Sequence, residues 1–305
     1  MNGVLLRCRF RKITASPLNE DFKLNLLYCC SPLKNTDRRK IDRMMKKRYF
    51  AIPILAIALH FLLSNLLYFL VERFVLDVFH ISPQQFMNYS YWGEILIYAV
   101  LILVFFTLYK LLWRKEISEP RTATNFKDVL GSLVVGFGIC GISGLWIMLA
   151  EQLPSLQKSV EAMNAGAENI AGGNAFGTFM IAVIGAPVVE EILFRGIVLR
   201  SMRKFAPAWA SILISSVLFG VYHLNIVQAA YATFMGIAAG ILYEKKRNLL
   251  FPILVHFANN LITMLQGFAP SEVNELISIF ILIMIAPAGY VVCRSLKQGK
   301  RADSM

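Results

Sequence analysis

Six ionisable side chains lie inside long apolar stretches of this sequence, where a charge is costly. An ionised group at the centre of a bilayer costs about 2.5–3.5 kcal/mol on insertion scales, so a chain that keeps one there has, by default, a functional reason. Five of the six fall between residues 190 and 256, which indicates one concentrated site. The six are His60, Glu190, Glu191, Arg195, His223 and His256.

The two adjacent glutamates are expected to differ in role. Glu191 and Arg195 stand at i and i+4 with the acid first, the favourable order for a pair, and pairing offsets much of the cost of burying either. Glu190 is rotated by about 100° on a helix and cannot share that face. Pro187 precedes it by about one turn and is placed to kink the helix and admit water. Glu190 is therefore predicted to be the carboxylate without a cation.

Counting residues places Glu190 and His223 at one depth. The turn between their helices falls at Ala206–Pro207, 16 residues after Glu190 and 17 before His223, so both lie about 24–26 Å from it. His256 and Asn260 stand ten and fourteen residues beyond the last basic turn, about 15–21 Å deep. Three helices thus bring polar groups to a similar depth.

The neighbours of these residues on each helix complete the set. Phe219 shares a helical face with His223, and Asn259 lies along one edge with His256 and Asn260. By contrast, His60 has no acidic partner at its depth and is expected to be structural.

This set of side chains is suited to hydrolysis. An unpaired carboxylate beside an imidazole, as Glu190 is beside His223, can act as general base on water. Across from it, His256 and Asn260 offer N–H donors that can hold an oxyanion. A hydrolase site is therefore predicted.

Two other mechanisms stay open from the residues alone. Ser215 and Ser216 lie two turns from His223, so nucleophilic attack by a hydroxyl is the less favoured alternative. Zinc is the main competitor, because one carboxylate and two imidazoles, Glu190, His223 and His256, form a usual catalytic ligand set with an open fourth position. The soluble HExxH signature is absent, so the sequence does not assert a metal.

The composition is that of a membrane protein. Of 305 residues, 57% are hydrophobic and 16% charged, against about 25% charged in soluble domains. The five cysteines are odd in number and lack metal-ligand spacing, which excludes a disulfide framework or a zinc finger. The net charge of +12 does not indicate nucleic acid, because no polar domain gathers the basic residues.

The apolar runs predict an all-α polytopic membrane protein with about eight transmembrane helices. A helix needs about 20 mostly apolar residues to cross the bilayer core. In no run do apolar and polar residues alternate with period two, so a transmembrane β-barrel is not expected. The expected spans are 50–71, 93–113, 128–150, 174–199, 208–224, 226–243, 248–266 and 273–293.

The positions of the basic residues predict which ends of these spans face the cytoplasm. Of the 31 Lys and Arg residues, 28 lie in segments that would all face one side if both termini are cytoplasmic. This positive-inside pattern favours an integral protein of, we expect, a bacterial plasma membrane, and the charge can attract anionic lipid. The loop 151–173 is expected to hold a short interfacial helix.

Four regions follow from these assignments. Residues 1–48 form a basic N-terminal tail without the apolar core of a signal peptide, expected to be disordered and cytoplasmic. Residues 49–127 hold two transmembrane helices, 128–293 a catalytic membrane core, and 294–305 a cytoplasmic tail.

Three ordered motifs resemble those of a known family. Glu190–Arg195 matches EExxxR, Phe219–His223 matches FxxxH, and His256–Asn260 matches HxxxN, as in the CPBP intramembrane proteases. That family includes the CAAX prenyl endopeptidases of the Ras-converting type, bacteriocin-processing enzymes and bacterial Abi proteins. The resemblance covers about residues 130–266. The two N-terminal helices and the tail match no motif.

The resemblance implies a role for each motif residue. It implies that Glu190 with His223 activates the attacking water, that His256 and Asn260 stabilise the oxyanion, and that Glu191 with Arg195 is structural. Family members are described as metalloproteases and as metal-independent glutamate proteases, so the resemblance leaves zinc open.

The sequence therefore predicts an endopeptidase that cuts a membrane-associated peptide or protein substrate. In a bacterium this is a leader peptide, a bacteriocin or an anti-sigma-like membrane protein rather than a prenylated one. Two rivals remain: a non-catalytic immunity or scaffold protein that keeps the site for binding, and a proton-coupled transporter. The transporter predicts polar groups strung across the bilayer and an inverted repeat, and neither is visible in the sequence.

Overall fold

The computed structural model describes the backbone of residues 35–80, 82–114, 124–171 and 174–302. Every regular element within these ranges is a helix, so the predicted all-α class is confirmed. Most of the predicted tail, residues 1–34, lies outside the described residues. The chain divides into two compact units, Met1–Ala51 and Ile52–Met305, and the second holds every candidate site residue.

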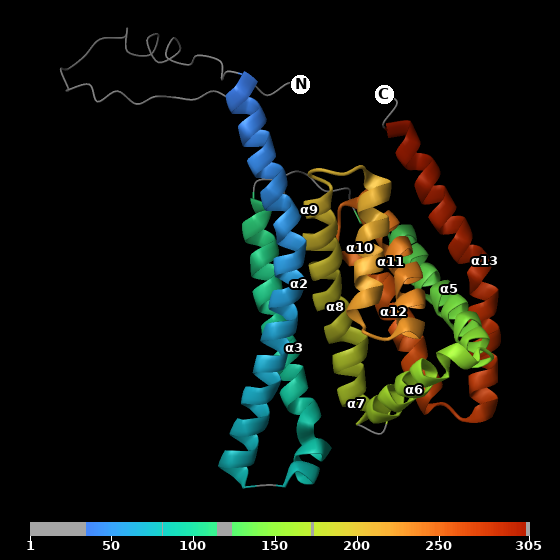
Figure 1. The fold of residues 1–305 in the computed structure, drawn as a ribbon. Coiled ribbons are helices and arrows are strands. Elements are labelled where there is room, and N and C mark those ends of the chain that lie inside the picture. The colour runs from blue at the N-terminus through green and yellow to red at the C-terminus, as the bar shows by residue number, and fades with distance from the viewer. Residues whose placement is uncertain (1–34, 81, 115–123, 172–173, 303–305) are drawn as a thin grey trace. The chain divides into compact units, whose positions relative to one another are not determined.

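The helices follow one another along the chain (Figure 1). Several consecutive pieces, from α7 to α9, make one continuous helical run, and two of these pieces are π-helices. In order the elements are α2 (Asn35–Phe79), α3 (Pro83–Leu112), α5 (Phe126–Glu151), the 3₁₀ turn η1 (Pro154–Leu156), α6 (Gln157–Ala171), α7 (Ala175–Thr178), the π-helix η2 (Phe179–Gly185), α8 (Ala186–Glu191), the π-helix η3 (Ile192–Leu199), α9 (Arg200–Met202), α10 (Ala208–Tyr222), α11 (Ile226–Lys246), α12 (Leu250–Phe268) and α13 (Ser271–Ala302).

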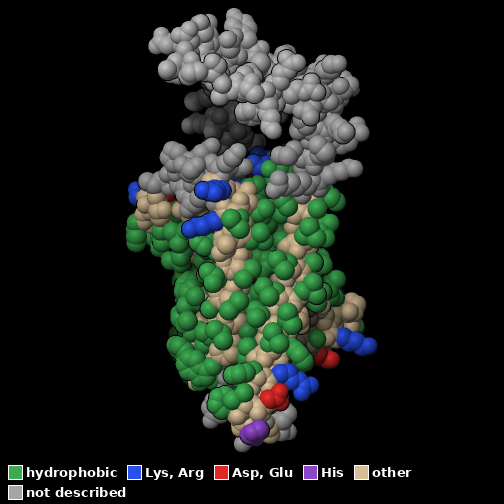
Figure 2. Space-filling model, turned by 90° about the vertical axis from the view of Figure 1, so that its left-hand side faces the viewer, with side chains coloured by type: hydrophobic (Ala, Val, Ile, Leu, Met, Phe, Trp, Pro, Cys, Tyr) green, Lys and Arg blue, Asp and Glu red, His purple; other side chains and the backbone are tan. Residues whose placement is uncertain are grey.

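Five helices in the described part of the chain are long and apolar enough to cross a membrane. They cover Tyr49–Phe79, Ser90–Leu112, Phe126–Glu151, Ile226–Lys246 and Ser271–Lys297. Figure 2 shows one face covered by hydrophobic side chains along its length, with charged side chains near its ends. A face of this kind is suited to lipid.

The remaining three of the eight expected spans are helical but differ from the other five. The expected span 174–199 is interrupted by π-turns, α10 has 15 residues, and α12 carries a histidine and two asparagines among its 19 residues. These three helices bear the motifs, and none of them is a continuous, fully apolar helix. The expected number of eight membrane-spanning helices is therefore approximate.

Close backbone contacts position these motif helices. α5 packs against both α12 and α13, and α10 packs against α11. Gly220 allows α10 and α11 to approach closely, because a Cβ there would strike the carbonyl oxygen of Ala229 and the hydroxyl of Thr233. Gly136 on α5 is equally constrained, since a Cβ would strike the backbone of Val255 and the side chain of Ala258 on α12. The backbone of α5 therefore touches α12 beside His256.

Replacing Gly136 by Ala is expected to destabilise the protein by about 1–3 kcal/mol, because the added methyl group overpacks a backbone contact. The same change at Gly144, on the same helix, meets nothing within 4 Å. There the better helix propensity of alanine should add about 0.5–1 kcal/mol. Thermal unfolding of both variants in one detergent measures the difference, and equal midpoints would contradict the packing described.

The loop predicted to hold a short helix contains α6, which contacts the connection between α10 and α11. Ser159 on α6 donates from its hydroxyl to the Asn225 side chain at 2.8 Å, and Asn225 caps the first turn of α11. Val160 packs with Ala150 and Val227 in a small apolar cluster. The motif histidine at the end of α10 is therefore followed by a turn that α6 holds in place.

Candidate active site

The two motif glutamates lie on an irregular part of their helical run. Pro187, which has no backbone N–H, stands at the start of α8, directly after the π-helix η2. Glu190 and Glu191 end α8, and the second π-helix, η3, begins at Ile192. Two π-helical segments thus flank Pro187 and the glutamates, and such widened turns are frequent at functional sites. The kink expected at Pro187 stays a prediction.

Glu191 and Arg195 form the expected ion pair. Arg195 Nη1 lies 2.8 Å from Glu191 Oε1, and both side chains are fully buried. The guanidinium also lies over the ring of Phe219, 4.7 Å from its centroid. The same Glu191 oxygen is 3.1 Å from His256 Nδ1. The ion pair on one helix therefore also fixes the histidine of another.

Glu190 is buried, and no Lys or Arg among the described residues forms an ion pair with it. Its Oε2 lies 3.9 Å from His256 Nε2, and this oxygen has no hydrogen-bond partner among the described residues. Because buried polar atoms are nearly always hydrogen-bonded, a free carboxylate oxygen here marks a place for water or substrate. His256 thus stands between two carboxylates, with one ring nitrogen toward each.

His223 is the C-cap of α10 and is held by its own helix. Its Nδ1 lies 2.9 Å from the backbone oxygen of Phe219. A carbonyl only accepts, so Nδ1 carries the proton and Nε2 is left as the acceptor. Between the described side chains of His223 and Glu190 there is no direct ion pair or hydrogen bond, so the predicted cooperation of the two requires a bridging water.

Both imidazoles pack against the ring of Phe219. The His223 and His256 rings each meet it edge-on, at centroid distances of 5.0 and 5.7 Å. Phe219 is itself fully buried. The predicted supporting residue therefore links the histidines of two motifs.

The two asparagines of the third motif are hydrogen-bonded. Asn260 Nδ2 donates to the carbonyl oxygen of Ala182, in the π-helix η2, at 2.8 Å, and Asn259 Nδ2 donates to Asn260 Oδ1 at 3.0 Å. The side chain of Asn260, the predicted oxyanion donor, is therefore held in place by Ala182 and Asn259. Its amide nitrogen has a second N–H that can donate to a substrate.

One contact next to the site was not predicted from the sequence. The Tyr222 hydroxyl lies 2.9 Å from Nδ1 of His60, on α2, and the Tyr222 ring packs against Phe194 and His223. The expectation that His60 has a structural role rested on the lack of an acidic partner at its depth, and the partner in the structure is a neutral hydroxyl. A tyrosine directly before the motif histidine was the available signal.

Replacing Tyr222 by Phe should destabilise the protein by about 1–3 kcal/mol, because the imidazole of His60 is left buried and unsatisfied. Replacing His60 by Phe should cost a similar amount, while the double variant should cost less than the sum. Thermal unfolding of the three proteins gives this coupling. Strict additivity would show that the hydrogen bond contributes nothing.

A three-ligand metal site is not assembled in the described part of the chain, where no group of three His, Cys, Asp or Glu side chains lies close enough to hold one ion. Glu190 and His256 approach one another, but His223 is directed to Phe219 and Tyr222. The predicted zinc set therefore does not fit as it stands, and zinc stays the untested alternative to a metal-free mechanism.

Comparison with known proteins agrees with the motifs. Residues 172–262 match the family model described as type II CAAX prenyl endopeptidase Rce1-like. Over 91 residues the chain is 29% identical to the putative membrane peptidase YdiL of Bacillus subtilis (strain 168), a match that covers 30% of this chain and 37% of that relative's length. No solved structure matches the chain. The matched segment contains all three motifs and confirms the resemblance to the CPBP family. Together with the apolar helices, it identifies an integral membrane protein.

Proposed function

We propose that this chain, which carries the CPBP motifs in residues 172–262, is an intramembrane endopeptidase acting on a membrane-associated peptide or protein. One observation carries the proposal: the buried carboxylate of Glu190 has an oxygen without a hydrogen-bond partner among the described residues, 3.9 Å from an imidazole nitrogen of His256. A free base beside a potential donor, inside an apolar bundle, is the arrangement that hydrolysis of an amide needs.

In the proposed reaction Glu190 and His223 hold the attacking water between them. Glu190 takes one proton as the water oxygen bonds to the carbonyl carbon of the substrate. The negative charge on the carbonyl oxygen is held by N–H donors of His256 and Asn260. When the C–N bond breaks, the proton passes from Glu190 to the leaving amine.

The contact with Glu191 determines which ring nitrogen of His256 donates a hydrogen bond. Since a carboxylate only accepts, Nδ1 of His256 donates to Glu191. Nε2 is then a donor only if the ring carries a second proton. The ring lies between Glu191 at 3.1 Å and Glu190 at 3.9 Å, so its Nε2 faces the side where the water is proposed to attack. Arg195 keeps Glu191 in position for this role.

The substrate must enter the bundle to be cut. The site lies well along three helices, and the basic ends of α9 and α11 lie at one end of those helices. With that end in the cytoplasm of a bacterial plasma membrane, a leader peptide, a bacteriocin precursor or an anti-sigma-like membrane protein is the proposed substrate class.

The test compares cells that produce the wild-type chain with cells that produce the Glu190→Gln variant at equal level. New protein ends near membrane segments are mapped by mass spectrometry. Fragments that need Glu190 support the proposal, and Glu94→Gln, a carboxylate change on α3, serves as control. Identical fragments in both strains, with an unchanged phenotype, would favour the non-catalytic alternative.

Removal of metal is expected to leave peptidase activity intact, because the donors Glu190, His223 and His256 are not gathered around one point. Metal content of the purified protein is measured alongside activity before and after chelation. One zinc per chain, with activity lost on chelation and restored by zinc, would contradict water activation by Glu190 and His223 alone.

A further inference from the structure

α12 carries a row of uncharged polar side chains from the site toward its far end. Asn259, Asn260, Thr263 and Gln266 follow His256 at spacings of three, four, seven and ten residues, which places them on one face of the helix. The row extends about 15 Å beyond His256. It leads away from the basic ends of α9 and α11.

Polar contacts join this row to two neighbouring helices. The Thr263 hydroxyl donates to the backbone oxygen of Asn259 at 3.0 Å. Cys140 Sγ, on α5, lies 3.7 Å from Thr263 Oγ1 and 4.0 Å from Gln266 Oε1. Gln266 Nε2 then donates to Ser278 Oγ, on α13, at 3.4 Å. The contacts therefore run unbroken from the site to α13.

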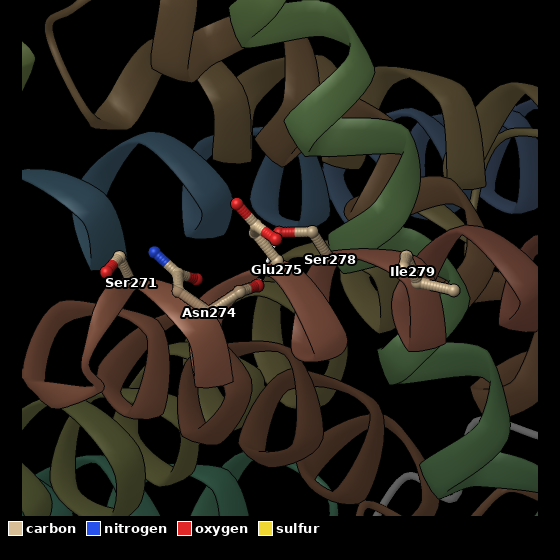
Figure 3. Close-up of a pocket in the computed structure, with 5 residues that line it drawn as sticks. All are labelled: Ser271, Asn274, Glu275, Ser278 and Ile279. Atoms are coloured by element: carbon tan, nitrogen blue, oxygen red, sulfur yellow. Dashed lines mark hydrogen bonds between the residues drawn. The ribbon is translucent and has the colours of Figure 1, made fainter.

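Ser278 lines a cleft at the start of α13. The cleft holds about 490 Å³ and is lined by Ser271, Asn274, Glu275, Ser278 and Ile279 (Figure 3). Figure 3 shows the side chains of Glu275 and Ser278 turned toward one another. None of the motif residues lines this cleft, so it is not itself the active site. It is the open end of the polar row.

Both ends of the row have a polar atom without a partner. Asn259 Oδ1, near the site, and Asn274 Oδ1, at the cleft, are buried and have no hydrogen-bond partner in the described structure. Thr263, between them, is an exposed residue. Ordered water normally satisfies such groups, and it needs two to four polar partners of the kind this row provides.

We propose that this row is a hydrated path along which water reaches Asn260 and Glu190 from the cleft on α13. The row between site and cleft is neutral, so it favours water over ions. An intramembrane hydrolase consumes one water per cut, and the path supplies it from the side opposite the basic helix ends. The use of this water in hydrolysis rests on the proposed function, whereas the hydration of the row does not.

Hydroxyl-radical footprinting of the full chain in lipid nanodiscs tests the path, because radicals formed from internal water oxidise the side chains beside it. Cys140 is 5% exposed and lies on the path, while Met148, on the same helix, is 64% exposed. The proposal expects Cys140 to be oxidised faster than Met148 despite its burial. Oxidation of Cys140 only after denaturation would overturn it.

A matched pair of variants keeps the result specific. Gln266→Leu blocks the path with a side chain of similar length and should lower the oxidation rate of Cys140 severalfold. Leu265→Phe, at the adjacent exposed position, should leave it unchanged. Equal rates in both variants would also overturn the proposal. Labelling needs no peptidase activity, so a chain that is hydrated here but cuts nothing would refute the proposed function and not the path.

Discussion

The Glu190→Gln variant is expected to lose peptidase activity by about 100- to 10,000-fold in kcat, the range that a general base contributes. The amide keeps the size of the side chain but cannot take a proton from water. Because Glu190 forms no close ion pair with a cation such as Arg195, the variant should fold and unfold at nearly the wild-type temperature.

Kinetics of the purified variant, with KM and the thermal midpoint measured on the same preparation, separate chemistry from folding. KM should change little, since the proposed role of Glu190 is in the chemical step. A control at Glu94, on α3, should keep full activity. A Glu190→Gln protein that cuts at the wild-type rate would remove Glu190 from the mechanism.

Replacing Arg195 by Met is expected to cost about 3–5 kcal/mol of stability, because it leaves the Glu191 carboxylate buried without its cation. The double variant Glu191→Leu with Arg195→Met should regain most of this, since apolar residues of similar size replace buried ion pairs at little cost. Thermal unfolding of the single and double variants measures the recovery.

The double variant also separates structure from catalysis. His256 loses the acceptor for its Nδ1 proton, so it is no longer held between two carboxylates. Stability should return while kcat stays low. If activity returned with stability, the Glu191–Arg195 pair would be structural only, as the family resemblance alone implies.

Helical periodicity predicted some of the contacts at the candidate site. The i,i+4 spacing of Glu191 and Arg195 predicted their pair, and rotation by one residue predicted that Glu190 would lack a cation. Counting from the turns placed Glu190, His223 and His256 at similar depth. The structure brings Glu190 and His256 to 3.9 Å, but it shows no direct contact between the described side chains of Glu190 and His223. These are properties of a single helix or of helix length, which a sequence specifies directly.

Features that depend on packing between helices could not be predicted. The π-helices η2 and η3 depend on tertiary contacts that no local pattern specifies. The His60 contact with Tyr222 joins helices far apart in the chain. Thr263 and Gln266 are uncharged, so they do not stand out in an apolar stretch as an ionisable group does.

The central claim is that water activated by Glu190 cuts a peptide bond inside the bundle. The direct measurement is product mass after cleavage by the purified wild-type chain in liposomes containing water labelled with oxygen-18, using a substrate found by fragment mapping. The account predicts one heavy oxygen in the new carboxyl terminus, and no product from Glu190→Gln. Product formed equally by the variant, or no cleavage by the wild-type chain, would contradict it.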